Sequence, residues 1–376
     1  MKYALESFRI SVAMDSLSSS LKPLNFGLSF SGCPIFPSKY RLVNYITRIY
    51  GLFLLIFLPP TFIADVDVGI LEDHPLLVKL MMRFWHLCFL FCTGLFIILI
   101  RFKRTKIGLL LDCLEKTLSP RDHKDIFRLS ITLFFFTGIC HFGFVVLILA
   151  IRFKNEYFNA WFSINMIINW AFSLSYFWFP ISINLYICLL KVVHVSERNL
   201  INRFEQDISK IHDPKKVYRL LIKLLDIKNG ISDSVSILPF CCFCYLLIET
   251  VASVCRHQIV YFDSRSTSLD KSFSVFCLFR AFNDMLMVIY LTFRTDSFCR
   301  ESSLKLESLE KSIISNKDPN EWSFVVGKIK ESQHFSYKAF NSFKINQNSL
   351  LVFSSSFVSL SVLFVQLIIN QNNIKT

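Results

Sequence analysis

Glycine is scarce in this sequence, with 10 in 376 residues, and none of them belongs to a Gly-rich phosphate-binding loop. The sequence also lacks a histidine pair at helical spacing and a Gly-x-Ser-x-Gly nucleophile elbow. These absences argue against nucleotide-dependent enzymes, zinc hydrolases and serine hydrolases. We therefore expect no enzyme activity and no cofactor.

The cysteines do not indicate a metal site. Most of the 12 lie inside apolar runs, where a thiol behaves as a small apolar side chain. The densest group, Cys241-Cys242-Phe243-Cys244, has no nearby histidine to complete a zinc site. We expect no bound metal.

Charge is missing from several apolar runs of about 20 residues, the length that crosses a bilayer as one helix. The chain is 53% hydrophobic, with a mean hydropathy of +0.47. This pattern predicts an all-α, multi-pass membrane protein with seven transmembrane helices. The expected spans are 45–64, 77–100, 129–151, 161–190, 237–260, 273–293 and 349–369. They define a cytosolic lead-in (1–44), spans one to four (45–190), a cytoplasmic helical loop (191–236), spans five and six (237–293), a second such loop (294–348), span seven (349–369) and an extracellular tail (370–376).

The net charge of +13 could indicate nucleic-acid binding, but the distribution of the basic residues favours a membrane explanation. Most of the 41 lysines and arginines lie before span one or in the loops that follow spans two, four and six. Cytoplasmic loops of membrane proteins are enriched in these residues. We therefore predict an intracellular N-terminus, an extracellular C-terminus and no nucleic-acid partner.

The three basic loops share a pattern of two helices separated by a proline. Ser119-Pro120, Asp213-Pro214 and Asp318-Pro319 each place a capping side chain before proline, which marks a helix start. The helices have apolar faces at three-and-four spacing. They either lie on the inner membrane surface or pack into a cytoplasmic bundle.

Three charged residues lie near the middle of spans five and six: Glu249 in span five, and Arg280 and Asp284 in span six. Charges in a membrane are costly, so each is a functional candidate. They form either a structural ion pair or the floor of an outward-facing ligand cavity. Other candidates for ligand binding lie in the outer halves of spans three to six, namely His141, Trp161, Asn165, Asn169, Trp170, Thr250, Ser253, His257 and Asn283.

The last span has no charge, and its largest polar side chains fall on one side. At about 100° per residue, one narrow arc holds Asn348, Ser355, Ser359, Val362, Gln366 and Asn373. The opposite side holds Phe353, Phe357, Leu360, Phe364 and Leu367. Lipid offers no partners to a polar stripe, so this arc meets protein or water. It is either a packing seam of small residues or the wall of a water-filled pore.

This span resembles the last transmembrane helix of the insect gustatory and odorant receptor superfamily. That family has Thr-Tyr, five hydrophobic residues and Gln-Phe; this chain has Ser359-Leu360, residues 361–365 and Gln366-Leu367. Gln366 matches, Ser359 is a conservative replacement, and Ser361 is not hydrophobic. The run 341–346 with Leu350-Leu351 also resembles the family's entry into this helix.

The resemblance implies a gustatory receptor-like, ligand-gated, non-selective cation channel in the plasma membrane. It implies a homo- or heterotetramer among membrane lipids, with span seven of each subunit around a central pore and the cytoplasmic bundle where subunits meet. A small tastant or odorant would bind from outside, between spans three and six. The implied pore and gate residues are Ser355, Ser359, Val362, Gln366 and Leu367.

Two other functions remain open from the sequence. A G-protein-coupled receptor would have the opposite orientation, and the chain has no Asp-Arg-Tyr box at span three and no Asn-Pro-x-x-Tyr motif in span seven. A secondary transporter could use Glu249, Arg280 and Asp284 as a relay, but no internal repeat is evident among the spans.

Overall fold

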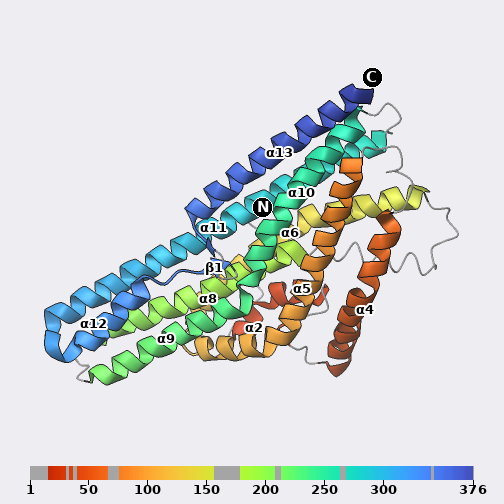
Figure 1. Cartoon of the computed structure of the whole chain (residues 1–376). Coiled ribbons are helices and arrows are strands. Elements are labelled where there is room, and N and C mark those ends of the chain that lie inside the picture. Colours follow the sequence, from red (N-terminus) through yellow and green to blue (C-terminus); the bar gives the residue numbers. More distant parts are fainter. Residues whose placement is uncertain are drawn as a thin grey trace, which may run out of the picture.

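The computed structural model describes residues 16–30, 34–36, 40–66, 76–155, 178–207, 213–262, 268–339 and 343–375. These residues are almost entirely helical (Figure 1). The elements are α2 (Leu17–Ser20), α3 (Lys22–Phe30), α4 (Arg41–Val66), α5 (Leu76–Glu115), α6 (Pro120–Asn155), α8 (Trp178–Asp207), α9 (Pro214–Val235), α10 (Ile237–Phe262), α11 (Ser268–Asn316), α12 (Pro319–Gln333), β1 (Lys338–Ala339), β2 (Phe343–Lys344) and α13 (Gln347–Lys375).

The expected spans coincide with helices. Six of them lie within α4, α5, α6, α10, α11 and α13, and the described part of the fourth lies within α8. Residues 161–177 are outside the described part. Within it, four helical stretches are long and apolar enough to cross a membrane: Arg83–Glu115, Trp178–Gln206, Pro214–Gln258 and Ser274–Asn316. The all-α membrane class is confirmed, while seven crossings and the orientation of the termini stay predictions.

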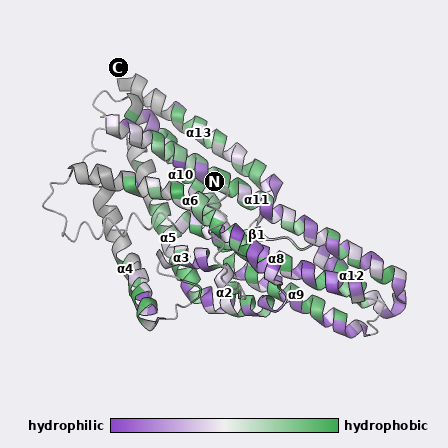
Figure 2. Cartoon of the chain, turned by 180° about the vertical axis from the view of Figure 1, so that it is seen from behind, coloured by the Kyte–Doolittle hydropathy of each residue, from purple (hydrophilic) through white to green (hydrophobic). Residues whose placement is uncertain are grey.

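Several helices are much longer than a bilayer is thick. α11 has 49 residues, which corresponds to a length of about 74 Å at 1.5 Å per residue. A hydrocarbon core is only about 30 Å thick, so one end of α11 must project into water. Figure 2 shows hydrophilic residues gathering toward α9 and α12, at the projecting end.

The projecting ends form a bundle of α8, α9, α11 and α12. Asp213 and Asp318 cap α9 and α12, accepting hydrogen bonds from the amides of Lys215 and Asn320, as the sequence predicts. The apolar faces cover one another in a separate buried cluster of Ile201, Val217, Leu221, Leu306, Leu309, Ile313, Trp322, Val325 and Ile329. These faces are therefore satisfied within one chain, which favours the bundle over helices lying on a membrane surface.

Residues 16–30 of the expected N-terminal lead-in contribute to the core. Leu17, Leu21, Leu24 and Leu28 are buried, and α2 and α3 pack against α6. The amide of Leu17 donates to Glu115 Oε1 at 2.8 Å, at the end of α5. The spacing of these leucines is the apolar face of a helix, a signal that the sequence analysis did not use.

A short hairpin connects the bundle to α13. β1 and β2 pair antiparallel, with Lys338 opposite Lys344. The amide of Ile345 donates to the carbonyl of Tyr337 at 3.0 Å, and Tyr337 is buried. The start of α13 is thereby tied to the bundle.

Candidate pore helix and buried charged cluster

α13 begins at a reciprocal cap. The amide of Ser349 donates to Asn346 Oδ1 at 3.0 Å, and the amide of Asn346 donates to Ser349 Oγ at 3.1 Å. The helix continues to Lys375, so it includes most of the expected tail, 370–376. This arrangement fixes the direction in which α13 leaves the hairpin.

One side of α13 packs against α10 and α11. Phe353 and Leu360 contact the main core, and the rings of Phe353 and Phe243 of α10 meet edge to face at 5.1 Å. This is the side that the sequence predicts to be apolar. The side chains of Phe357, Phe364 and Leu367 lie outside the described residues, so their positions stay predictions.

The predicted pore arc is exposed. Ser355, Ser359 and Gln366 are exposed, as is 51% of Val362. Among the described residues, this arc does not serve as a packing seam within the chain. Exposure also extends beyond it to Leu351, Val352, Val358 and Leu363, so an apolar surface flanks the arc. A partner or lipid must cover that surface.

The charged residues of α10 and α11 meet in the interior. Glu249 and Arg280 form an ion pair and are 0% and 3% exposed. Arg280 Nη2 also donates to the hydroxyl of Tyr245 at 3.3 Å. Asp284 and Asn283 are buried on α11, with Asp284 one turn beyond Arg280. The closed pair is the geometry of a structural ion pair, one of the two alternatives the sequence left open.

An aromatic cluster surrounds Tyr245. Its ring lies 5.2 Å from Trp178 and 5.5 Å from Phe179 of α8, and 5.9 Å from Phe89 of α5. Tyr245 thus connects the ion pair to aromatic rings of α5 and α8. The sequence analysis missed Tyr245, although it precedes Glu249 by four residues and so shares its helical face.

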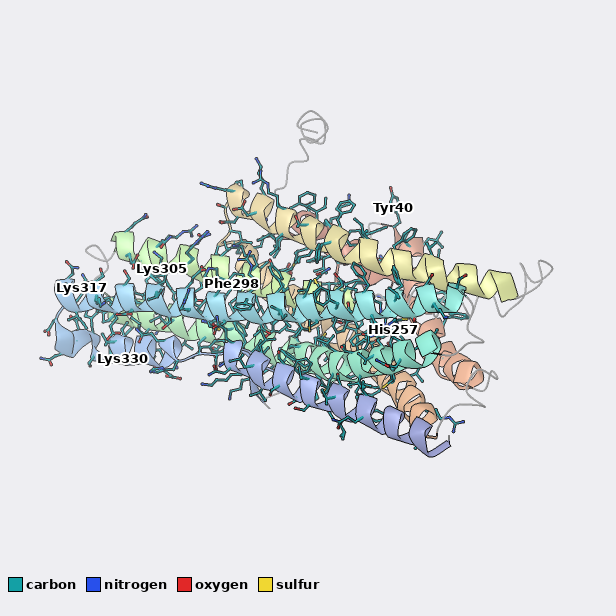
Figure 3. The ribbon with its side chains drawn as sticks, turned by 90° about the horizontal axis from the view of Figure 1, so that it is seen from above. Tyr40, His257, Phe298, Lys305, Lys317 and Lys330 are labelled. Carbon is teal, nitrogen blue, oxygen red and sulfur yellow. The ribbon has the colours of Figure 1, made fainter. Side chains whose placement is uncertain are left out.

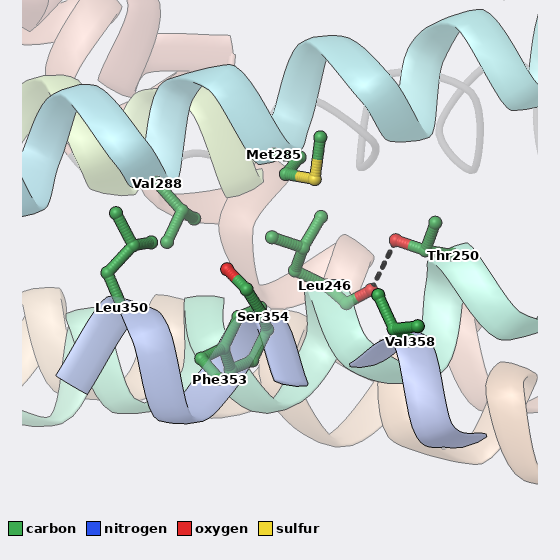
Figure 4. A pocket seen from close by; sticks show the side chains of 8 residues that line it. All are labelled: Leu246, Thr250, Met285, Val288, Leu350, Phe353, Ser354 and Val358. Atoms are coloured by element: carbon green, nitrogen blue, oxygen red, sulfur yellow. Dashed lines mark hydrogen bonds between the residues drawn. The ribbon is translucent and has the colours of Figure 1, made fainter. Parts of the chain in front are cut away.

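A groove lies between α10, α11 and α13, next to the ion pair. Its volume is about 240 Å³, and Figure 4 shows its lining of Leu246, Thr250, Met285, Val288, Leu350, Phe353, Ser354 and Val358. The Thr250 hydroxyl donates to the carbonyl of Leu246 at 2.8 Å. The groove is therefore almost entirely apolar, and Glu249, Arg280 and Asp284 do not line it.

The predicted ligand residues are only partly brought together. Ser253 of α10 is buried, and His257 Nδ1 lies 3.2 Å from Ser274 Oγ of α11. Ser253 and His257 therefore lie at the contact between α10 and α11. The His141 side chain and residues Trp161, Asn165, Asn169 and Trp170 lie outside the described part. Within that part, no group of three or more His, Cys, Asp or Glu residues could hold a metal ion.

The bundle contains a second buried ion pair. Lys228 Nζ of α9 lies 3.0 Å from Glu197 Oε1 of α8 and 3.2 Å from Ser302 Oγ of α11. The same ammonium lies 4.7 Å from the ring centroid of Phe335, just before the hairpin. One lysine therefore joins three helices to the segment that leads into α13.

The turn between α5 and α6 is fixed by Asp122. This carboxylate accepts hydrogen bonds from the Ser119 amide at 2.9 Å and Asn199 Nδ2 at 2.8 Å, and pairs with Arg198 at 3.3 Å. Burial alone would raise the pKa of Asp122. The hydrogen bonds from Ser119 and Asn199 and the charge of Arg198 outweigh burial, so this pKa lies below its usual value.

These features define an all-α membrane protein with a peripheral, partly polar last helix and a projecting helical bundle. The structure of the insect olfactory receptor OR5 from Machilis hrabei matches with a TM-score of 0.67 and 14% identity, over 92% of this chain and 97% of that one. The structure of the same receptor in complex with eugenol matches with a TM-score of 0.67 and 14% identity, over 93% and 98%. Comparisons with protein families and with curated proteins find no match. The resemblance noted in the sequence is thus confirmed at the level of the fold.

Proposed function

We propose that the chain is a subunit of a chemosensory, gustatory receptor-like cation channel opened by a small molecule. The observation that carries this proposal is the two-sided α13, with Phe353 and Leu360 packed on the core and the arc of Ser355, Ser359 and Gln366 exposed. Four such arcs around one axis would line a pore with hydroxyl and amide groups. The likeness of the fold to a solved olfactory receptor supports it.

In the assembled channel, Gln366 lines the conduction path near its outer end and Leu367 supplies the apolar part of the gate. A constriction formed by apolar side chains can close a pore by dewetting. Leucine is smaller than the phenylalanine of the family motif, so four copies would form a less bulky constriction. The apolar residues Val352 and Val358, exposed beside the arc, provide surface for contacts between subunits or with lipid.

The ligand enters from outside, at the plasma membrane, and binds among the outer halves of spans three to six. Aromatic side chains with a few polar groups, as the sequence has in this region, suit a small molecule. The eugenol complex of the olfactory receptor supports a ligand of this size. The candidates to contact it among the described residues are Thr250, Ser253, His257 and Asn283, with Glu249, Arg280 and Asp284 at the floor of the site.

A recording from the purified protein in a planar bilayer tests the channel function. We expect single-channel cation currents that increase with a member of a panel of small volatile and sapid compounds. Ligand-dependent currents in the absence of any G protein would contradict the alternative of a G-protein-coupled receptor. Ligand-driven signalling that requires a G protein, with no current from the purified protein, would refute the channel.

Cysteine substitution tests the orientation of α13. Ser355→Cys, Ser359→Cys and Gln366→Cys should react with a charged thiol reagent and lose current, whereas Leu360→Cys on the packed side should not. The unsubstituted chain is the control for its own cysteines. Block at Leu360→Cys together with protection of the three arc positions would show that the arc does not line the pore.

A further inference from the structure

Positive side chains from two helices gather where α4 begins and the apolar part of α5 ends. Arg48 is exposed on α4, and Arg101, Lys103, Arg104 and Lys106 follow one another on α5, half-buried or exposed. Arg101 Nη2 donates to the backbone carbonyl of Arg48 at 3.5 Å, across 53 positions of sequence. We call these five residues the basic patch. Four of its members come from one run of α5, and tertiary packing adds Arg48 of α4.

The basic patch has no countercharge of its own. Residues 16–64 and 74–111, which include α2, α3, most of α4 and most of α5, contain no aspartate or glutamate. Among the described residues, no carboxylate forms an ion pair with any member of the patch. The first acidic residue after the patch on α5, Asp112, is exposed and forms no ion pair with the patch, and Glu115 at the end of α5 accepts a hydrogen bond from the amide of Leu17. Like charges held side by side repel one another, so an external anion would be stabilised here.

Exposed apolar and aromatic side chains border the basic patch. Phe102 of α5 is 79% exposed, and Tyr40, just before α4, is 73% exposed. Tyr40 is labelled in Figure 3. Leu42 and Tyr45 are exposed on the same end of α4. Aromatic residues in this position are typical of the boundary between hydrocarbon and water. The patch therefore lies at the level of lipid headgroups, beside surface that contacts lipid tails.

We propose that the basic patch binds the headgroup of an anionic phospholipid in the leaflet that faces the helical bundle. Lysine and arginine clusters next to a transmembrane helix attract anionic lipids, and guanidinium groups bind phosphate oxygens in pairs of hydrogen bonds. An acidic protein segment would match the charge but would leave the bordering Phe102 and Tyr40 exposed. The proposal rests on the membrane-spanning arrangement proposed above, but not on channel activity.

Binding to the purified full chain in neutral detergent tests this proposal. The probes are fluorescent short-chain phosphatidylserine and, for comparison, phosphatidylcholine of the same chain length. We expect the wild type to prefer phosphatidylserine, and R101Q/R104Q to bind it about 30-fold more weakly. R101K/R104K should retain most of the affinity because it keeps the charge. The matched control is K305Q/K317Q, which removes the same charge at the far end of the bundle (Figure 3) and should bind as the wild type does.

Several outcomes would overturn the proposal. One is equal affinity of the wild type for phosphatidylserine and phosphatidylcholine. Another is an equal loss of phosphatidylserine affinity in the patch and control variants. A third is binding of inorganic phosphate as tight as that of phosphatidylserine, which would show that the acyl chains contribute nothing. Binding of poly-glutamate at the patch without binding of phosphatidylserine would assign an acidic protein partner instead. If R101Q/R104Q does not fold, R104Q/K106Q carries the same test. Because lipid binding is measured without current, its failure is distinguishable from failure of the channel function.

Discussion

Neutralising Glu249 should lower the free energy of unfolding much more than neutralising a surface glutamate does. Glu249→Gln leaves the Arg280 guanidinium buried between α10 and α11 without its carboxylate. Removing one partner of a buried pair costs about 3–5 kcal/mol of unfolding free energy. The amide and the hydroxyl of Tyr245, 3.3 Å from Arg280 Nη2, replace only part of that interaction. We therefore expect a value near the lower limit.

Thermal unfolding of the purified protein in detergent is the assay. A loss of this size should lower the midpoint by roughly 4 °C for a chain of this length. Glu307→Gln is the matched control, because Glu307 pairs with Lys311 at 2.7 Å but is 48% exposed. An exposed pair contributes about 0–1 kcal/mol, so the control should shift the midpoint by no more than about 2 °C.

A double-mutant cycle shows whether the two charges depend on each other. Glu249→Gln combined with Arg280→Met removes both, so it should cost less than the sum of the single changes. Additive losses would mean that the pair is not coupled. Unchanged midpoints for Glu249→Gln, with a loss of ligand response, would instead show that Glu249 contacts ligand.

Three further predictions concern the bundle and the start of α13. The folded-state pKa of Asp122 is lowered, so its contribution to stability is complete above the unfolded-state pKa of about 3.9. That contribution is lost as the pH falls further toward the folded-state pKa. Unfolding measured as a function of acid pH should show this loss in the wild type and not in Asp122→Asn. Lys228→Met leaves Glu197 buried without its ammonium, so we expect a loss of about 3–5 kcal/mol in denaturant unfolding, and a loss under about 1 kcal/mol would contradict the buried pair. Asn346→Ala removes the cap of α13 and should cost about 1 kcal/mol, seen as faster amide exchange confined to its first turn, with Asn348→Ala as the exposed control.

The sequence by itself determined the class of the protein and the position of its helices. Long charge-free runs predict membrane helices because an unpaired backbone group is costly in hydrocarbon. Local capping chemistry also sets where helices begin, which is why Asp213-Pro214 and Asp318-Pro319 located α9 and α12. The two-sided character of α13 follows from helical geometry, so Phe353 and Ser355 could be assigned to different faces before the structure.

Only the tertiary structure decided which of the separated residues meet. Periodicity gives the face of a helix but not its neighbour, so it could not distinguish an Arg280–Glu249 pair from an Arg280–Asp284 pair. It also could not place Tyr245 beside Arg280, Lys228 beside Glu197, or Arg48 beside Arg101. These contacts join helices that are distant in sequence. They depend on how whole helices pack, which is a property of all their side chains together.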